Sequence, residues 1–149
     1  MHYEIVELKE AKIAGLAART NNSSPDMENV ISGLWQRFFA EGGYSAIPDK
    51  INGSALGIYT DYESDERGDY TFMTGCAVTG DAPEGFEVRT LPAGKYARFT
   101  VVGDMVTAVK GFWQQLWEMP LDRTYVFDFE EYRNTDPENC EIHIYIGIR

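Results

Sequence analysis

The chain has 149 residues and a formal net charge of −11, and its length is typical of one domain with one sizeable core. This acidity disfavours direct binding to the phosphate backbone of nucleic acids. No apolar run approaches the roughly 20 residues that a transmembrane helix needs, and the first ten residues lack the basic and apolar segments of a signal peptide. A cytoplasmic protein is therefore expected.

Few features of the sequence point to a metal or a cofactor. Cys76 and Cys140 do not form a CxxC pair and are expected to be reduced, partly buried thiols. His143 is accompanied only by His2, whereas zinc usually needs three or four ligands. Phosphate-binding and nucleophile motifs are missing, so no metal and no cofactor are predicted. The chain is instead rich in tyrosine and tryptophan, which often line sites for flat organic molecules.

The first elements belong to an internal repeat. Residues 3–16 (YEIVELKEAKIAGL) align without a gap with residues 86–99 (FEVRTLPAGKYARF). Each copy is typical of a strand, a tight turn and a second strand, and Pro92 and Gly94 suit the second turn. The alignment predicts that the two halves of the chain share one structural plan.

A helix is predicted after each copy, over residues 25–41 and residues 104–118, because apolar side chains recur there at helical spacing. A pair of strands follows each helix. The first pair covers about 55–62 and 69–79, and the second about 125–133 and 140–148. The strand pairs continue the repeat, since matching residues stand at Tyr62 and Tyr132, Phe72 and Ile142, and Cys76 and Ile146.

These elements predict an α+β fold in a single domain over residues 1–149, with repeats at about 1–80 and 84–149. Each repeat is expected to be a ββαββ module. A helix can cover one face of a four-stranded antiparallel sheet. We therefore expect the helices outside and the bare faces of the sheets lining a shared central groove.

The last strand suggests which residues face this groove. In CEIHIYIGIR the alternating isoleucines should pack beneath the second helix, which turns the residues between them the other way. In YVFDFEEYR we place Phe127 and Phe129 in the core and Glu130 and Tyr132 on the opposite face. Trp113 could reach the groove from the helix edge. The predicted ligand-binding residues are Tyr62, Trp113, Glu130, Tyr132, Glu141, His143 and Tyr145.

Such residues also occur on an ordinary solvated sheet face, and that interpretation stays open. The functional interpretation is a groove with aromatic walls and acidic groups at its floor. It would suit flat amphipathic cations through ring stacking, cation–π contact and a partly desolvated carboxylate. Desolvation would also raise the pKa of that carboxylate and fit it for acid–base chemistry.

Four segments resemble the gyrase-inhibitor-like (GyrI-like) proteins, which are also the effector-binding domains of AraC-type and MerR-type multidrug regulators: LPAGKYARFTVVGD, FWQQLWE, FDFEEY and EIHIYIGI. The resemblance implies two SHS2-type modules related by a pseudo-twofold axis. Between them it implies a pocket for bulky aromatic cations with a buried glutamate. Its motifs fall on Phe129, Glu130 and Tyr132, and on Glu141 and Tyr145. Gly147 and His143 depart from the proline and the acid that many members carry.

The resemblance implies three functions. The first is a stand-alone bacterial protein that binds aromatic, cationic small molecules, for drug sequestration, sensing or transcription regulation. The second is a hydrolase that opens electrophilic cyclopropane rings of DNA-alkylating natural products, with Glu130, Glu141 and Tyr145 as catalytic residues. The third is an interaction with gyrase or a regulator. No helix-turn-helix is recognised, and the oligomeric state, monomer or homodimer, is left open.

Overall fold

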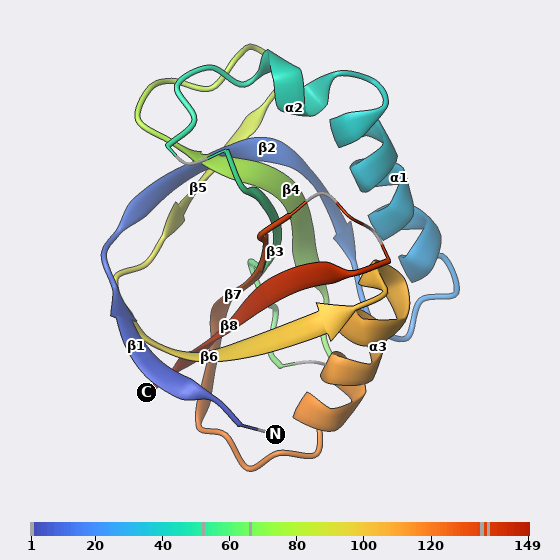
Figure 1. The fold of residues 1–149 in the computed structure, drawn as a ribbon, viewed down its shortest axis with the longest axis vertical. Helices are drawn as coiled ribbons and strands as arrows, with labels where there is room; N and C mark the ends of the chain where they lie inside the picture. The colour runs from blue at the N-terminus through green and yellow to red at the C-terminus, as the bar shows by residue number, and fades with distance from the viewer. Residues whose placement is uncertain (1, 52, 66, 135, 137) are drawn as a thin grey trace.

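The computed structural model describes residues 2–51, 53–65, 67–134, 136 and 138–149, and Figure 1 shows their fold. The described residues form eight strands and three helices. In chain order these are β1 (Glu4–Leu8), β2 (Ala11–Thr20), α1 (Met27–Phe39), α2 (Gly43–Ala46), β3 (Ala55–Thr60), β4 (Tyr70–Val78), β5 (Glu87–Leu91), β6 (Gly94–Gly103), α3 (Met105–Leu116), β7 (Arg123–Tyr132) and β8 (Cys140–Ile148).

All eight strands belong to one antiparallel sheet in the order β1-β6-β8-β7-β3-β4-β2-β5. The predicted α+β class is therefore confirmed. The two expected four-stranded sheets are joined through the pairing of β3 with β7. The counterparts in the two repeats are β1 and β5, β2 and β6, β3 and β7, and β4 and β8. When each strand is replaced by its counterpart, the order reads the same from the opposite edge of the sheet. A pseudo-twofold axis between β3 and β7 produces such an order.

The strands of the first aligned segment do not pair with each other. Strand β1 pairs with β6 of the second repeat, and β5 pairs with β2 of the first. Each repeat therefore contributes one edge strand to the other half of the sheet. This exchange ties the halves together, because neither edge strand has its partner within its own repeat.

Both long helices lie on the same face of the curved sheet (Figure 1). Helix α1 packs on β2 and β4, and α3 packs on β6. Phe112 and Leu116 of α3 belong to the same buried core as Ile142, Ile144 and Ile146 of β8, as the sequence predicts. Each helix thus covers the outer strands of its own half. The two central strands, β3 and β7, lie between the helices.

Among the residues that the structure describes, the opposite face of the sheet is filled by side chains. Side chains from β2 to β8 fill it with an apolar core of their own, which includes Met73, Phe129 and Tyr145. The rings of Phe129 and Tyr145 are stacked with their centroids 4.5 Å apart. We expected a groove on the side of the sheets that points away from the helices. This expectation is wrong, because the curved sheet closes over apolar side chains on that side.

In the described part of the chain, no helix has the length and apolar character needed to cross a membrane.

Candidate functional site

A large cavity lies between α1 and α3, above the two central strands. Its volume is about 480 Å³, and most of its wall is aromatic or apolar. Because each helix packs on outer strands, a space remains where the helices do not meet over β3 and β7. The lining residues are Asn22, Met27, Glu28, Ile31, Ser32, Trp35, Tyr59, Tyr62, Tyr70, Phe72, Met105, Val109, Lys110, Trp113, Gln114, Trp117, Arg123, Glu130 and Tyr132.

Strand register places Glu130 at the floor of this cavity. Glu130 lies opposite Ile144 on β8 and opposite Gly57 on β3, and directly paired residues share a face of a sheet. Glu130 therefore points to the helical side, together with the isoleucines. Phe129 points the other way, opposite Tyr145. Phe129 and Glu130 lie on opposite faces of β7, as expected, and Glu130 and Tyr132 line the cavity. The expectation that these two residues share a face with Glu141, His143 and Tyr145 is wrong, because they pair with Ile144 and Ile142 of β8.

The carboxylate of Glu130 is buried, with 1% of the residue exposed, and three side chains donate hydrogen bonds to it. The indole Nε1 of Trp113 and the hydroxyl of Tyr59 donate to Oε2 at 2.8 and 2.9 Å. The hydroxyl of Tyr132 donates to Oε1 at 2.7 Å. Burial raises the pKa of Glu130, and these donors offset part of that rise. An acceptor-only, ionised carboxylate matches this set of donors.

Two aromatic pairs flank Glu130 in a symmetrical arrangement. Trp35 of α1 meets Tyr132 with ring centroids 5.2 Å apart, and Trp113 of α3 meets Tyr59 at 4.8 Å. Phe72 and Ile142 are counterparts in the two repeats. Tyr59 pairs with Phe72 and Tyr132 pairs with Ile142, so Tyr59 is the counterpart of Tyr132. The predicted match of Tyr62 with Tyr132 is therefore wrong by three residues. The pseudo-twofold axis exchanges the two aromatic pairs.

The same register makes Gly57 the counterpart of Glu130, and the two residues are direct partners across β3 and β7. The pseudo-twofold axis therefore passes between them. A Cβ atom on Gly57 would lie 3.0 Å from Oε1 of Glu130 and 3.1 Å from Cζ2 of Trp35. The site holds one central carboxylate because the position across the axis has no side chain.

We expect Gly57→Ala to destabilise the protein by about 1–3 kcal/mol, since the added methyl group must displace the carboxylate or the indole. The matched control is Gly111→Ala in α3, where a Cβ would meet nothing within 4 Å. That change should stabilise the helix by about 0.5–1 kcal/mol. Urea unfolding of both variants measures the difference. Equal stabilities would show that Gly57 is not needed for close packing.

A second buried polar group lies beside the cavity, around Asp128. Nη2 of Arg123 donates to Oδ2 of Asp128 at 2.9 Å, and both side chains are almost fully buried. The Tyr62 hydroxyl also donates to Oδ2, and the backbone N–H of Gly147 donates to Oδ1. Burial raises the pKa of Asp128, against the opposing influence of Arg123. Tyr62 therefore borders the cavity through this cluster and not through the Glu130 cluster.

Three predicted residues do not line the cavity, because they lie on the other face of the sheet. Tyr145 is buried against Phe129. Nε2 of His143 lies 3.5 Å from a carboxylate oxygen of Glu141, and its Nδ1 lies 3.8 Å from one of Glu131. Glu141 is about half exposed at its side chain. The hydrolase hypothesis required Glu130, Glu141 and Tyr145 to converge on one site. They do not, because Glu130 lies on the other face of the sheet.

The rim of the cavity carries one ion pair between the helices. Glu28 of α1 and Lys110 of α3 approach to 3.6 Å, and both side chains are largely exposed. Arg123, the other cation of the lining, pairs with Asp128. Among the residues that the structure describes, Glu130 is the lining carboxylate without a cationic partner.

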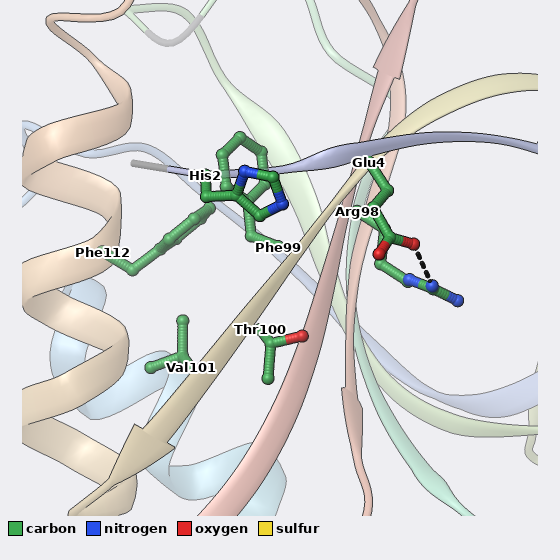
Figure 2. A pocket seen from close by; sticks show the side chains of 7 residues that line it. All are labelled: His2, Glu4, Arg98, Phe99, Thr100, Val101 and Phe112. Atoms are coloured by element: carbon green, nitrogen blue, oxygen red, sulfur yellow. Dashed lines mark hydrogen bonds and ion pairs between the residues drawn. The ribbon is translucent and has the colours of Figure 1, made fainter.

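A smaller cavity of about 260 Å³ lies between β1, β6 and α3. Figure 2 shows its lining, with the side chains of Glu4 and Arg98 joined by an ion pair at 2.5 Å. This acid is thus already neutralised, and its side chain is largely exposed. The smaller cavity lacks the buried, cation-free carboxylate of the large one.

Sequence reasoning missed several residues of the large cavity. The predicted lining did not include Trp35, Tyr59, Tyr70 or Arg123. One signal was available for Trp35. The segments LWQRFF and FWQQLW align Trp35 with Trp113, so the expectation that Trp113 reaches the cavity applied equally to Trp35.

The family of integron-associated effector-binding proteins (Cass2) matches residues 4–148 of this chain. Among curated proteins, the candidate transcriptional regulator YobU of Bacillus subtilis (strain 168) is 29% identical over 154 residues. The alignment covers 97% of this chain and 96% of YobU.

Two solved structures illustrate the similarity of the fold. The integron cassette protein from the mobile metagenome of Vibrio cholerae is 27% identical, with a TM-score of 0.79 over 99% of this chain and 95% of that one. SAV2435, solved with bound tetraphenylphosphonium, is 21% identical, with a TM-score of 0.82 over 100% of this chain and 94% of that one. The GyrI-like effector-binding fold expected from the sequence is therefore confirmed.

Proposed function

Because this chain belongs to the family of integron-associated effector-binding proteins, we propose that it binds bulky aromatic cations in the cavity between α1 and α3. The binding would serve sensing or sequestration of such compounds. The positive centre lies over the Glu130 cluster, and the aromatic arms lie against the two symmetrical ring pairs.

One observation carries this proposal: a buried carboxylate with no cationic partner among the described residues, at the floor of an aromatic cavity. Burying a negative charge is costly unless it is compensated. Three neutral donors compensate Glu130 in part. A ligand cation would complete the compensation, and the faces of Trp and Tyr rings attract the same charge. SAV2435, which shares the fold, has been solved with a ligand of this class.

The proposal is tested with two ions of nearly equal shape and opposite charge, tetraphenylphosphonium and tetraphenylborate. Calorimetry and tryptophan fluorescence should show saturable binding of the phosphonium and little binding of the borate. Mass spectrometry should recover the ligand unchanged. Equal affinities for both ions would contradict the role of the carboxylate, and a modified ligand would favour the hydrolase hypothesis.

Phosphonium binding should weaken as the pH falls through the raised pKa of Glu130. Tetraphenylphosphonium carries a permanent charge, so a pH dependence must come from the protein. The ionised carboxylate attracts the cation and the protonated one does not, so affinity is lost on the acid side. Tyr59, Tyr132 and Trp113 face Glu130 as hydrogen-bond donors, and burial raises the pKa of both tyrosines. Calorimetric titrations from pH 8 downward measure the effect.

The control for this profile is Glu130→Gln, which removes the titrating group while the rest of the lining is kept. Its affinity should be low and nearly independent of pH. A wild-type profile that persists in this variant would assign the titration to another residue.

A further inference from the structure

The guanidinium of Arg123 keeps hydrogen-bonding capacity that the protein does not use. Its Nη2 donates to Asp128. Its Nε is buried and has no hydrogen-bond partner among the residues that the structure describes. The Arg123 side chain is 5% exposed, so water has little access to it. A buried donor without an acceptor is rare in folded proteins, because its lost hydration is not repaid.

Arg123 lines the same cavity as Glu130, and Trp113 lies between the two groups. The guanidinium carbon is 6.0 Å from the centre of a Trp113 ring, and the indole Nε1 of Trp113 is bonded to Glu130. The cavity therefore has a carboxylate and a hydrogen-bond donor that border one indole. Nε is itself covered in the ligand-free protein, so a ligand oxygen contacts it only after the side chains that cover it have shifted.

We propose that Arg123 is a second recognition point, which receives a hydrogen-bond acceptor of the ligand. The ligand class is then an aromatic cation that carries a carbonyl or ether oxygen on one of its arms. This inference rests on the proposed function, because it assigns the positive centre of the ligand to Glu130. The oxygen accepts from the unused N–H of Arg123, next to the ring that stacks on Trp113.

The acceptor is expected to be a neutral oxygen and not a carboxylate. Asp128 already neutralises the charge of Arg123 at 2.9 Å, and the Tyr62 hydroxyl donates to the same carboxylate. Glu130 would repel a second negative charge within the cavity. The ion pair of Arg123 with Asp128 leaves the N–H at Nε as a hydrogen-bond donor without net charge to be compensated. Such a donor favours a polar but uncharged acceptor.

The test compares two ligands of nearly equal shape: tetraphenylphosphonium with an acetyl group on one ring, and the same ion with an isopropenyl group. The isopropenyl group has a methylene in place of the carbonyl oxygen. Each is prepared as its ortho, meta and para isomer. We expect the best acetyl isomer to bind the wild-type protein about tenfold more tightly than its isopropenyl counterpart, as a hydrogen bond from a charged donor allows.

Variants show whether the preference depends on Arg123. Arg123→Lys keeps a cation for Asp128 but lacks the Nε donor. The pair Arg123→Met with Asp128→Asn removes both charges and leaves an amide for Tyr62 and Gly147. In each, the ratio of acetyl to isopropenyl affinity should fall close to one. Thermal unfolding identifies which variants are folded.

Two results would overturn the inference: no isomer pair distinguished by the wild-type protein, or a tenfold preference that survives both substitutions. These failures leave the proposed function intact as long as plain tetraphenylphosphonium binds. If that ion does not bind, the proposed function fails, and the role of Arg123 fails with it.

Discussion

Glu130→Gln is expected to reduce the affinity for tetraphenylphosphonium about thirtyfold, which corresponds to about 2 kcal/mol. The substitution is nearly isosteric. The side-chain oxygen of glutamine can still accept from Trp113 and Tyr59, and the Tyr132 hydroxyl can rotate to accept from the amide. The aromatic walls should therefore stay in place, and the lost affinity reports the charge. Calorimetry at pH 7.5 provides the measurement.

The matched control is Glu141→Gln, which removes the same charge from the opposite face of the sheet. The long-range contribution of net charge is equal in both variants, so a difference between them belongs to the cavity. We expect the affinity of Glu141→Gln to stay within about twofold of the wild type, since exposed charges at a distance are screened by salt. Similar losses in both variants would assign the effect to overall acidity.

The ligand-free protein should become more stable when Glu130 is replaced by glutamine. A carboxyl group whose pKa is raised by folding favours the folded state below its unfolded pKa, and this contribution is lost as the pH rises through its folded pKa. At neutral pH the buried charge therefore opposes folding. Glutamine does not ionise, so the thermal midpoint of the ligand-free variant should exceed that of the wild type at pH 7.5. The cavity would then gain its ligand affinity at the expense of stability.

The second large effect is expected from Arg123→Met, which should destabilise the fold by about 3–5 kcal/mol. Asp128 would keep its donors Tyr62 and Gly147 but lose its cation in a site where the residue is fully buried. The remaining charge is costly, so the pKa of Asp128 should rise further and the deficit should shrink as the pH falls. Urea unfolding at pH 7.5 and at pH 5 measures both effects.

Two comparisons separate pairing from other consequences of the change. Arg149→Met removes a cation from an exposed pair with Asp122, whose N–O distance is 2.6 Å, and should alter stability by less than about 1 kcal/mol. The double change of Arg123→Met and Asp128→Asn should recover most of the loss, because no unpaired charge remains. A deficit in the double variant as large as in Arg123→Met would mean that Arg123 contributes through packing.

The helices, the strands and the internal repeat could be predicted from the sequence. Alternation of Ile142, Ile144 and Ile146 with polar residues predicted a strand covered on one side by a helix, and that core is found under α3. Helical spacing predicted α1 and α3 within about two residues of their observed ends. These features depend on local periodicity, which a single segment records by itself.

The placement of the cavity depended on relations between strands, which no single segment records. In YVFDFEEYR, both the phenylalanines and the residues between them alternate, so either set could face the helices. Pairing of Glu130 with Ile144 and with Gly57 decides the question, and a shift by one residue would reverse every side chain. The irregularity in the register of β7 between Arg123 and Asp128 also could not be predicted from local sequence patterns.

The sequence by itself thus determined which residues form strands and helices, that the chain repeats, and that Glu130, Tyr132 and Trp113 are candidates for one site. Only the tertiary structure decided that the site lies between the helices and that Gly57 leaves room for a single carboxylate on the pseudo-twofold axis. The physical reason is that burial of Glu130 arises from two helices and two strands that are distant in sequence. Their separation, and not the composition of any one of them, creates the space.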